Sequence, residues 1–443
     1  MDRAQREAVA AGILADCDAD ETEAIVYSSD SGLTRFTHNA IHQNVAAGDT
    51  VARIRAVFDG RTGVATTNHL GVESLRAAIA RAKGLARLAP RDDAHVPMSK
   101  AEPPPPALGA WVDATAAATP AVRAKIARAI FDVAERNALW AAGFVTTSAE
   151  GTTIANSRGT LASFDGTECA LAIKQNGPDS TGYAERYSKD VADLDGAVSG
   201  EVAAHKAVES ASPATVEPGE WTVILEPAAA CELLATLTGH FSAQSYDEGS
   251  SFLAGNLGRP LMPENVTIVD DVRHPLHPGM PFDFEGVPTQ RVALVENGVG
   301  NAVVTDTAWA ARLGRANTGH ALPAPNAAGP QARHLVIAGG DKTREELIAE
   351  TKRGLLISRL WYVRTVDYRR TILTGMTRDG TFLVENGRIA GGVRNLRFNQ
   401  SMLEALQSAQ FGRDLARAVG YSCSIVLPVV KFDRFSFTST TDF

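Results

Sequence analysis

Residues 281–298 read PFDFEGVPTQRVALVENG, and this stretch decides the fold of the second half of the chain. It opens with two carboxylates two residues apart, Asp283 and Glu285, followed by Gly286 and a proline, a composition typical of a turn. The next run, RVALVE at residues 291–296, is rich in apolar and β-branched side chains and ends at Asn-Gly, a hairpin signal. The stretch therefore predicts a turn, a strand and a hairpin.

Four further segments surround this stretch in a fixed order. Upstream lie GSSFLAGNLG at residues 249–258 and VTIVDD at residues 266–271; downstream lie DTAWAARLG at residues 306–314 and NTG at residues 317–319. In this order the segments resemble the TldD/PmbA family, and the stretch at residues 35–44 is similar to the family's N-terminal part. The resemblance implies a protein family whose TldD and TldE (PmbA) subunits form a heteromeric zinc metallopeptidase.

The composition is that of an ordinary globular protein. Hydrophobic residues make up 44% of the 443 residues, charged residues make up 21%, and the mean hydropathy is -0.08. The net charge is -8, so no basic surplus is present to neutralise phosphates, and we expect no nucleic acid as the main partner. No stretch supplies about 20 unbroken apolar residues, so we expect no membrane partner.

The N-terminal sequence and the spacing of the cysteines predict a cytoplasmic location. The N-terminus, MDRAQREAVAAGILADCDADE, is charged from residue 2 and lacks the apolar core of a signal peptide. The four cysteines, Cys17, Cys169, Cys231 and Cys423, are far apart and lack metal-type spacing. We interpret them as reduced thiols, most of them buried.

The periodicity predicts an α+β chain of two domains. Residues 1–211 are expected to form a mixed sheet covered by helices, and residues 212–443 a mostly antiparallel, barrel-like β domain with few helices. The boundary is set by SPATVEPG at residues 212–219, which has two prolines and no apolar run. The proline-containing residues 89–113 predict a long crossing loop within the first domain.

Individual elements follow from the same patterns. Helices are expected at residues 2–15, 70–88, 120–138, 193–211, 227–239, 345–352 and 401–412. Turns or loops are expected at residues 28–33, at Gly151, at residues 179–187, at Asp379-Gly380 and at Asn386-Gly387. Strands are expected between these segments, including residues 291–296, 300–305, 355–361 and 365–373.

The zinc-binding motif that the resemblance implies is absent. TldD-type subunits carry His-Glu-x-x-x-His on the first helix of the second domain, before the Gly-Ser-Ser segment. Stepping back from Gly249 without gaps places these positions at Leu234, Ala235 and Gly239. Cys423 does not match the family's Cys-Gly-Lys ligand motif. We therefore expect no catalytic residue and no cofactor in this chain, with Zn²⁺ held by a TldD-like partner.

Several histidines are weak candidates for a metal site. His240 lies one residue beyond the motif position, and His274 and His277 form a His-x-x-His pair in a proline-rich turn. His38 and His42 are four residues apart, but the local pattern is that of strand and turn, which favours surface histidines. No further ligand accompanies any of these groups in the sequence.

The candidate substrate-groove residues are Asp283, Glu285, Gly286, Thr289 and Arg364. The first four lie in the acidic turn, which in the family lies near the peptidase site. Asp270 and Asp271 could join Asp283 and Glu285 in binding a hard cation, although acids solvated in turns are the simpler interpretation.

Arg364 stands in the unusual stretch LWYVRTVDYRR at residues 360–370, which also holds Tyr362 and Asp367. The alternation predicts a strand with one polar face. The planar guanidinium of Arg364 could still bind a carboxylate through two hydrogen bonds.

Three functions are consistent with these observations. The first is a TldE/PmbA-like subunit without zinc, which completes a peptidase with a TldD-like partner and degrades or processes small or unfolded peptides, including precursors of natural products. The alternative is a stand-alone homo-oligomeric protein that binds peptides without proteolysis. A third possibility is an enzyme with a different catalytic set around residues 360–370.

Overall fold

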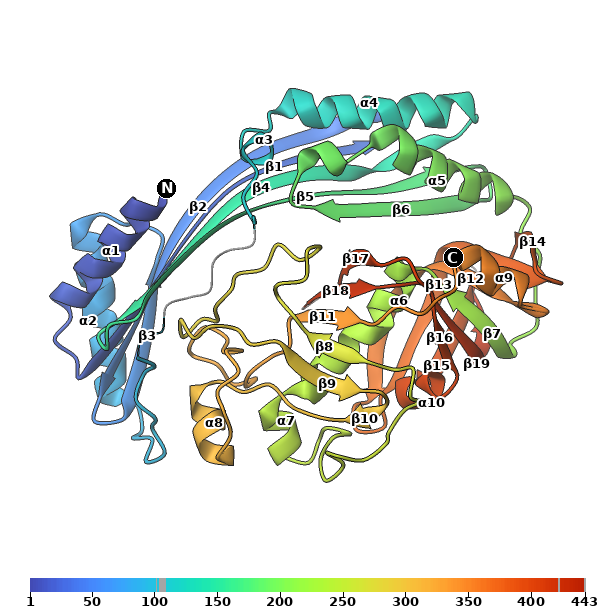
Figure 1. Cartoon of the computed structure of the whole chain (residues 1–443). Coiled ribbons are helices and arrows are strands. Elements are labelled where there is room, and N and C mark those ends of the chain that lie inside the picture. Colours follow the sequence, from blue (N-terminus) through green and yellow to red (C-terminus); the bar gives the residue numbers. More distant parts are fainter. Residues whose placement is uncertain (101, 103–108, 421–422, 442–443) are drawn as a thin grey trace.

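The structure is a computed structural model that describes the chain except residues 101, 103–108, 421–422 and 442–443. It confirms the predicted α+β class. The first half contains one sheet covered by helices, and the second half contains a closed five-stranded barrel and a second sheet (Figure 1).

The first sheet is long, curved and antiparallel, in the order β3-β2-β1-β4-β5-β6 (Figure 1). Its strands are β1 (Glu21–Thr37), β2 (Ala40–Phe58), β3 (Arg61–Thr67), β4 (Trp140–Asn156), β5 (Leu161–Asn176) and β6 (Thr181–Ser188). The helices lie on its convex side, and the second half of the chain lies under its concave side.

The covering helices are α1 (Arg3–Asp16), α2 (Val72–Leu88), α3 (Asp113–Ala116), α4 (Pro120–Arg136) and α5 (Gly196–Glu209), with the 3₁₀ turn η1 (Val191–Asp193). The start of α1 is fixed by a capping box between Asp2 and Gln5, and its buried face repeats at Arg6, Ala10 and Ile13. This spacing of three to four residues is why the sequence predicted the helices well.

Two predicted interruptions of the sheet are wrong. Residues 28–33 lie inside β1, and Gly151 lies inside β4. Both segments pair on two sides, which overrides their turn composition. A Cβ at Gly32 would lie 2.3 Å from Nη1 of Arg123, and one at Gly151 would lie 2.1 Å from Nη1 of Arg6. These glycines thus give space to buried arginines rather than turning the chain.

The predicted loop at residues 179–187 is also wrong, since β6 occupies most of it. Gly182 lets this strand approach the α5 backbone, because a Cβ there would lie 2.0 Å from the carbonyl oxygen of Ala203. The expected crossing loop at residues 89–113 includes residues 101 and 103–108, which lie outside the described residues.

The barrel is built from β12, β7, β19, β15 and β13, with β13 pairing back to β12. Its strands are β7 (Gly219–Leu225), β12 (Arg353–Asp367), β13 (Ile372–Glu385), β15 (Leu396–Ser401) and β19 (Val430–Thr440). Outside the barrel, strand β14 (Arg388–Gly392) pairs with β13, and β16 (Ala409–Phe411) pairs with β19.

The second sheet has the order β10-β9-β8-β11-β18-β17. Its strands are β8 (Ile268–Asp270), β9 (Val292–Glu296), β10 (Val299–Gly300), β11 (His334–Ile337), β17 (Ala416–Val419) and β18 (Ser424–Leu427). The helical segments of this half are α6 (Pro227–Leu234), η2 (Ala235–Phe241), α7 (Ala243–Asp247), α8 (Thr307–Leu313), α9 (Arg344–Ala349) and α10 (Met402–Leu406). One hydrophobic core joins α6, the barrel and this sheet.

Of the two turns predicted from an Asn-Gly or Asp-Gly pair at residues 379–387, one is confirmed and the other is wrong. Asn386-Gly387 connects β13 to β14 as predicted, whereas Asp379-Gly380 lies within β13. There the register between β12 and β13 shifts, and Asp379 and Gly380 have φ values of 53° and 125°, so the pair forms a bulge. The helix predicted at residues 401–412 is only α10, and the strand predicted at residues 300–305 is only the short β10.

None of the helices in the described part of the chain has the length and apolar character needed to cross a membrane.

Candidate functional site

Asp283 fixes the acidic turn from inside. Its Oδ1 accepts hydrogen bonds from the backbone N–H of Glu285 at 2.9 Å and of Val287 at 3.0 Å, and its Oδ2 accepts one from Ala321 at 2.8 Å. Burial raises the pKa of Asp283 well above its usual range and Glu285 adds to this effect, whereas the three N–H donors oppose it. Asp283 thus ties the turn to the segment around Ala321.

Glu285 connects the turn to both halves of the molecule. Its Oε2 accepts a hydrogen bond from the backbone N–H of Thr307 at 3.1 Å, and its carbonyl oxygen accepts one from the Ser99 hydroxyl at 2.7 Å. Burial raises the pKa of Glu285. The carboxyl also lies near Glu23 of β1, whose pKa is raised to about 7, first by burial and further by Glu285.

Gly286 and Thr289 have structural roles in the same turn. Gly286 has a φ of 76°, and a Cβ there would lie 2.4 Å from Cγ2 of Thr160 in the first half. Thr289 is buried, and its backbone N–H donates to the carbonyl oxygen of Pro281 at 3.0 Å. The turn therefore packs directly on the first sheet.

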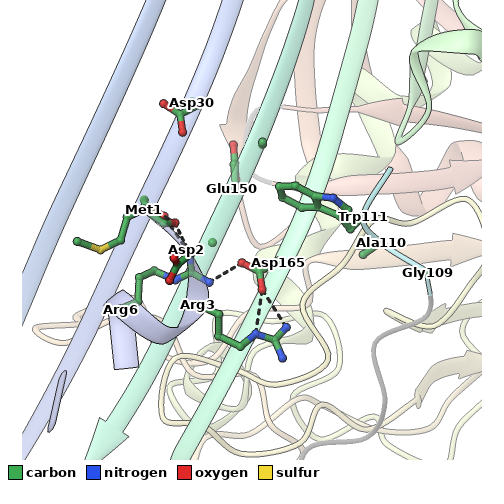
Figure 2. Close-up of a pocket in the computed structure, with 13 residues that line it drawn as sticks. Met1, Asp2, Arg3, Arg6, Asp30, Gly109, Ala110, Trp111, Glu150 and Asp165 are labelled. Carbon is green, nitrogen blue, oxygen red and sulfur yellow. Dashed lines mark hydrogen bonds and ion pairs between the residues drawn. The ribbon is translucent and has the colours of Figure 1, made fainter. Parts of the chain in front are cut away.

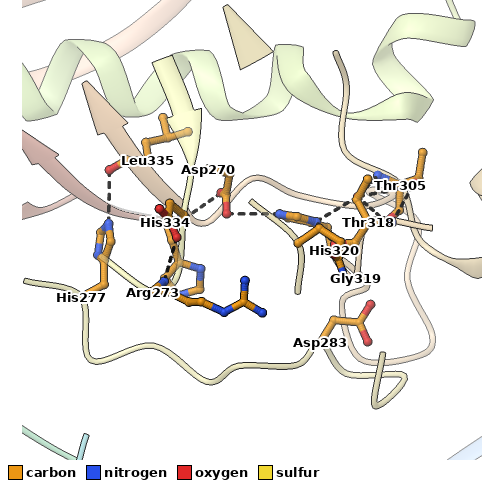
Figure 3. Close-up of polar contacts among 12 residues, drawn as sticks. Asp270, Arg273, His277, Asp283, Thr305, Thr318, Gly319, His320, His334 and Leu335 are labelled. Carbon is orange, nitrogen blue, oxygen red and sulfur yellow. Dashed lines mark hydrogen bonds and ion pairs between the residues drawn. The ribbon is translucent and has the colours of Figure 1, made fainter. Parts of the chain in front are cut away.

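Asp270 and His320 form a buried pair beside the turn (Figure 3). Nε2 of His320 lies 3.1 Å from Oδ1 of Asp270, and Oδ2 accepts a hydrogen bond from the backbone N–H of His334 at 2.9 Å. Burial alone raises the pKa of Asp270, but His320 and the His334 N–H outweigh it and hold the pKa at about 2.

The partners of His320 indicate which atoms carry protons. Nδ1 lies 2.9 Å from the carbonyl oxygen of Thr318 and 3.0 Å from its hydroxyl oxygen, whose own proton goes to the carbonyl oxygen of Thr305. Nδ1 therefore donates, while Nε2 faces the Asp270 carboxylate. Both ring nitrogens of His320 therefore face acceptor oxygens.

The interpretation of these acids as solvated turn residues is wrong for Asp270 and Asp283, which are 0% and 5% exposed. Backbone N–H groups and His320 replace water around them. Nor do these acids gather around a common point: the Asp270 carboxyl lies 3.1 Å from the His320 ring, while the Asp283 carboxyl accepts from backbone N–H groups.

A cavity of about 320 Å³ lies where this turn meets the concave face of the first sheet. Its lining from the second half includes Asp283, Thr289, Gly319, His320 and Arg333, and its lining from the first half is Tyr27, Glu150, Thr152 and Phe164. Arg333 lies over the Phe284 ring, with its Cζ 5.5 Å from the ring centroid. Of the predicted groove residues, Asp283 and Thr289 reach this cavity.

Sequence reasoning missed His320 and Arg333. The signal for His320 was present, because it directly follows the NTG segment at residues 317–319. Arg333 stands in a region without a motif, so only the packing of residues 278–334 against the first sheet identifies it.

The positions expected for the zinc motif are packing positions. Leu234 and Ala235 are 1% and 9% exposed and belong to the main core. A Cβ at Gly420 would lie 2.8 Å from the Ala235 Cβ, and a Cβ at Gly239 would lie 2.6 Å from the Tyr368 hydroxyl oxygen. The space around α6 and η2 is therefore filled by carbon and by an aromatic ring.

His240 lies at this place but is enclosed by rings. Its ring stacks on that of Tyr368 with the centroids 4.0 Å apart. The Phe252 ring is tilted against it, with the centroids 5.1 Å apart. Nδ1 is buried without a hydrogen-bond partner in the described residues, and burial lowers the pKa of His240 to about 4. One imidazole without companion ligands does not fit a zinc site, which takes three or four ligands.

His274 and His277 lie close together, with ring centroids 6.1 Å apart. His277 is buried between the Ser424 hydroxyl at 3.1 Å and the Leu335 carbonyl oxygen at 3.3 Å, and burial lowers its pKa to about 3. Within the described ranges, no group of three or more His, Cys, Asp or Glu side chains has an arrangement that could hold a metal ion.

Arg364 lies on β12 away from the acidic turn. Its Nη1 donates to the carbonyl oxygen of Val363 at 2.7 Å, and its guanidinium lies over the Tyr362 ring at 4.8 Å. Burial raises the pKa of Glu232 in α6, and the charges of Arg359 and Arg364 oppose this rise. The structure therefore does not bring Arg364 together with Asp283 or Glu285.

Another cavity, of about 520 Å³, lies beside α1 and contains none of the predicted site residues (Figure 2). Its two arginines already have a partner, since Asp165 accepts from Arg3 at 2.9 Å and from Arg6 at 2.5 Å. One carboxylate thus serves both arginines, and Asp30 and Glu150 also line this cavity.

Comparison with known families gives matches over most of the chain. Residues 218–439 match the PmbA/TldA metallopeptidase C-terminal domain, and residues 22–86 match the PmbA/TldA metallopeptidase domain 1.

Among curated proteins, the chain is 27% identical over 289 residues to the metalloprotease PmbA of Escherichia coli O157:H7, covering 62% of this chain and 61% of that protein. It is 26% identical over 227 residues to a metalloprotease of Methanothermobacter thermautotrophicus, covering 49% of this chain and 48% of that protein. The matched regions thus span about half to three fifths of these relatives.

Among solved structures, TldE from Thermococcus kodakarensis is similar in fold. Its TM-score is 0.89 at 23% sequence identity, and the alignment covers 98% of this chain and 99% of that chain.

Proposed function

Because the chain belongs to the TldD/PmbA metallopeptidase family, we propose that it is a TldE (PmbA)-like subunit of a heteromeric zinc metallopeptidase. In this proposal a TldD-like partner holds the zinc, and this chain completes the chamber in which small or unfolded peptides are cut. The assembly acts in the cytoplasm. Precursors of peptide natural products are one substrate class.

The observation that carries the proposal is the filled motif region at α6 and η2. A zinc peptidase needs two imidazoles on one helical face and a carboxylate that activates water. At those positions this chain has Leu234, Ala235 and Gly239, and Tyr368 occupies the adjacent space. Installing a metal there would require exchange of several core side chains, so the hydrolytic chemistry is assigned to the partner.

A peptide as the substrate is supported by two edge strands, one from each sheet, that line the same cavity. In the described sheets, β6 is the last strand of the first sheet and β17 is the last strand of the second. The two strands lie close together, and Tyr183 and Glu185 of β6 and Val419 of β17 line a common cavity of about 470 Å³. Unpaired strand edges bind extended peptides through backbone hydrogen bonds.

The test is peptide hydrolysis by the chain alone, by a TldD-like partner alone and by the two together. We expect cleavage of an unfolded peptide to need both chains. Alteration of the partner's His-Glu-x-x-x-His motif should abolish cleavage, whereas His240→Phe in this chain should leave most of it. Hydrolysis by this chain alone that is lost in His240→Phe would contradict the proposal.

The stand-alone peptide-binding protein remains distinguishable in the same experiment. It is the result in which the chain binds the peptide and no TldD-like partner changes its mass or confers cleavage.

A further inference from the structure

The cavity of about 470 Å³ between the first sheet and the barrel gathers more positive charge than the acidic turn does. It is lined by residues of seven elements, β4, β5, β6, α6, β12, β13 and β17, among them Lys174, Arg359 and Arg378. Neither the predicted groove residues nor the zinc-motif positions are among them.

Three cations of this cavity share one carboxylate. The Asp379 carboxyl lies 3.0 Å from Nη1 of Arg359, 3.4 Å from Nζ of Lys174 and 3.8 Å from Nε of Arg378. Asp379 is 3% exposed, while the three cations keep 25%, 30% and 36% of their side-chain surface exposed. The cluster therefore carries two positive charges more than its carboxylate neutralises.

The local backbone explains this arrangement. Asp379 and Gly380 form the bulge of β13, where both residues have positive φ. A bulge re-aims a side chain that regular pairing would direct elsewhere. Asp379 is thereby directed between Arg359 of the neighbouring strand and Lys174 of the first sheet, and it holds both at the cavity.

Aromatic rings fix the arginines in place. Cζ of Arg359 lies 4.6 Å from the Tyr183 ring centroid and 4.8 Å from the Trp361 ring centroid, and Cζ of Arg378 lies 4.9 Å from Trp361. Stacking on aromatic faces orders a guanidinium while leaving its in-plane N–H groups available. The N–H groups of Arg359 and Arg378 are therefore ordered and available to donate to a bound acceptor group.

Two further carboxylates of the lining, Glu185 and Glu232, form no ion pair with these cations in the described part of the chain. The Tyr183 hydroxyl donates to Glu185 at 2.5 Å; burial raises the pKa of both Glu185 and Glu232, and the Arg359 charge opposes the rise in both. The ion pairs of all three cations go to Asp379 instead.

We infer that this cavity is a carboxylate-binding subsite, in which Arg378, Arg359 and Lys174 bind the C-terminal carboxylate or an acidic side chain of a peptide that lies between β6 and β17. The peptide as the carrier rests on the proposed function, whereas the preference for a carboxylate rests on the charges alone. Trp361 forms one wall and reports occupancy.

The test uses the chain alone and three probes: N-acetyl-Ala-Ala-Leu as the free acid, its C-terminal amide, and N-acetyl-Ala-Glu-Leu amide. Binding is followed by tryptophan fluorescence and by titration calorimetry, with Trp361→Phe to identify the Trp361 signal. We expect the acid to bind about tenfold tighter than the plain amide, as a charge-assisted hydrogen bond allows. Tighter binding of the acid would identify the C-terminal carboxylate as the bound group. Tighter binding of the glutamate-containing amide would identify an acidic side chain.

The variants give opposite signs. Arg378→Gln should reduce affinity for the carboxylate probe about tenfold and leave the amide unchanged. Glu232→Gln should increase that affinity, because it removes a negative charge from the cavity wall. Arg312→Gln, which removes an equal charge at an exposed ion pair elsewhere, is the matched control.

Equal binding of acid and amide, or equal effects of Arg378→Gln and Arg312→Gln, would overturn the inference. If the complex with a TldD-like partner cleaves peptides under those results, the subsite alone has failed. If the probes bind as expected but the complex shows no cleavage, the subsite stands and the proposed function fails.

Discussion

At Gly286 the acidic turn leaves no space for a side chain. A Cβ there would lie 2.4 Å from Cγ2 of Thr160, and φ is 76°. The sequence predicted the turn from Gly286 and its neighbours, but the contact with Thr160 joins residues far apart in the chain. Composition identifies a turn, whereas only packing identifies what the turn touches.

We predict that Gly286→Ala lowers the free energy of unfolding by about 2–3 kcal/mol, because left-handed strain and a steric clash add. Gly255→Ala is the matched control, since Gly255 has a φ of 73° with nothing within 4 Å of its Cβ position, and should cost about 1 kcal/mol. Urea unfolding measures both. Thr160→Ser, which removes the clashing methyl group, should rescue the excess; no rescue would show that the turn does not pack on Thr160.

The Asp270–His320 pair predicts a loss of stability in acid. The pKa of Asp270 is about 2 in the folded protein, against an ordinary value of 3.8. A lowered carboxyl pKa stabilises the folded state above pH 3.8, and this contribution of about 2 kcal/mol is lost as the pH falls toward 2. Asp270→Asn should show a smaller loss of unfolding free energy in this window, whereas Asp271→Asn should behave as the unaltered protein. Equal slopes for all three proteins would contradict the assignment.

At the scale of elements, amphipathic helices were predicted well and strand interruptions were not. The buried arginines that pass over Gly32 and Gly151 come from α4 and α1, so no local pattern could show that those glycines are mid-strand. The bulge at Asp379 was likewise interpreted as a reversal. Local turn composition does not distinguish a chain reversal from a glycine that accommodates a distant side chain.

The helical segment α6 and η2 offers a direct stability test of the filled motif region. Leu234→Ala should lower the free energy of unfolding by about 2–5 kcal/mol, because it leaves a cavity in the core. Val202→Ala in α5, where the valine is 45% exposed, should cost less than about 1 kcal/mol. Added zinc should change neither value. A neutral Leu234→Ala would show that this position is not a packing position.

At the scale of the whole molecule, two of the cavities form where the curved sheet faces the second half. The resemblance led to Asp283 and Thr289 on one cavity, but the charged cavity draws its lining from seven elements. Its residues include Lys174 and Arg378, which are about 200 positions apart in the sequence. Such a site has no linear motif, which is why sequence reasoning did not find it.

The contact between the halves also predicts a pH dependence. Glu23 on β1 faces Glu285, and its pKa is raised from 4.5 to about 7. Between these values the unfolded chain releases the proton more readily, so the free energy of unfolding should decrease by about 3 kcal/mol as the pH rises through this window. Glu23→Gln should remove most of this decrease, and the exposed Glu73→Gln should not. Parallel pH profiles for all three proteins would contradict the raised pKa of Glu23.

The most direct test of the central claim is the zinc content and mass of the chain, measured by elemental analysis and light scattering, alone and co-expressed with a TldD-like partner. We expect no stoichiometric zinc on the chain alone, and a larger, zinc-containing assembly with the partner. Stoichiometric zinc on the chain alone, lost on substitution of His240, would contradict this expectation.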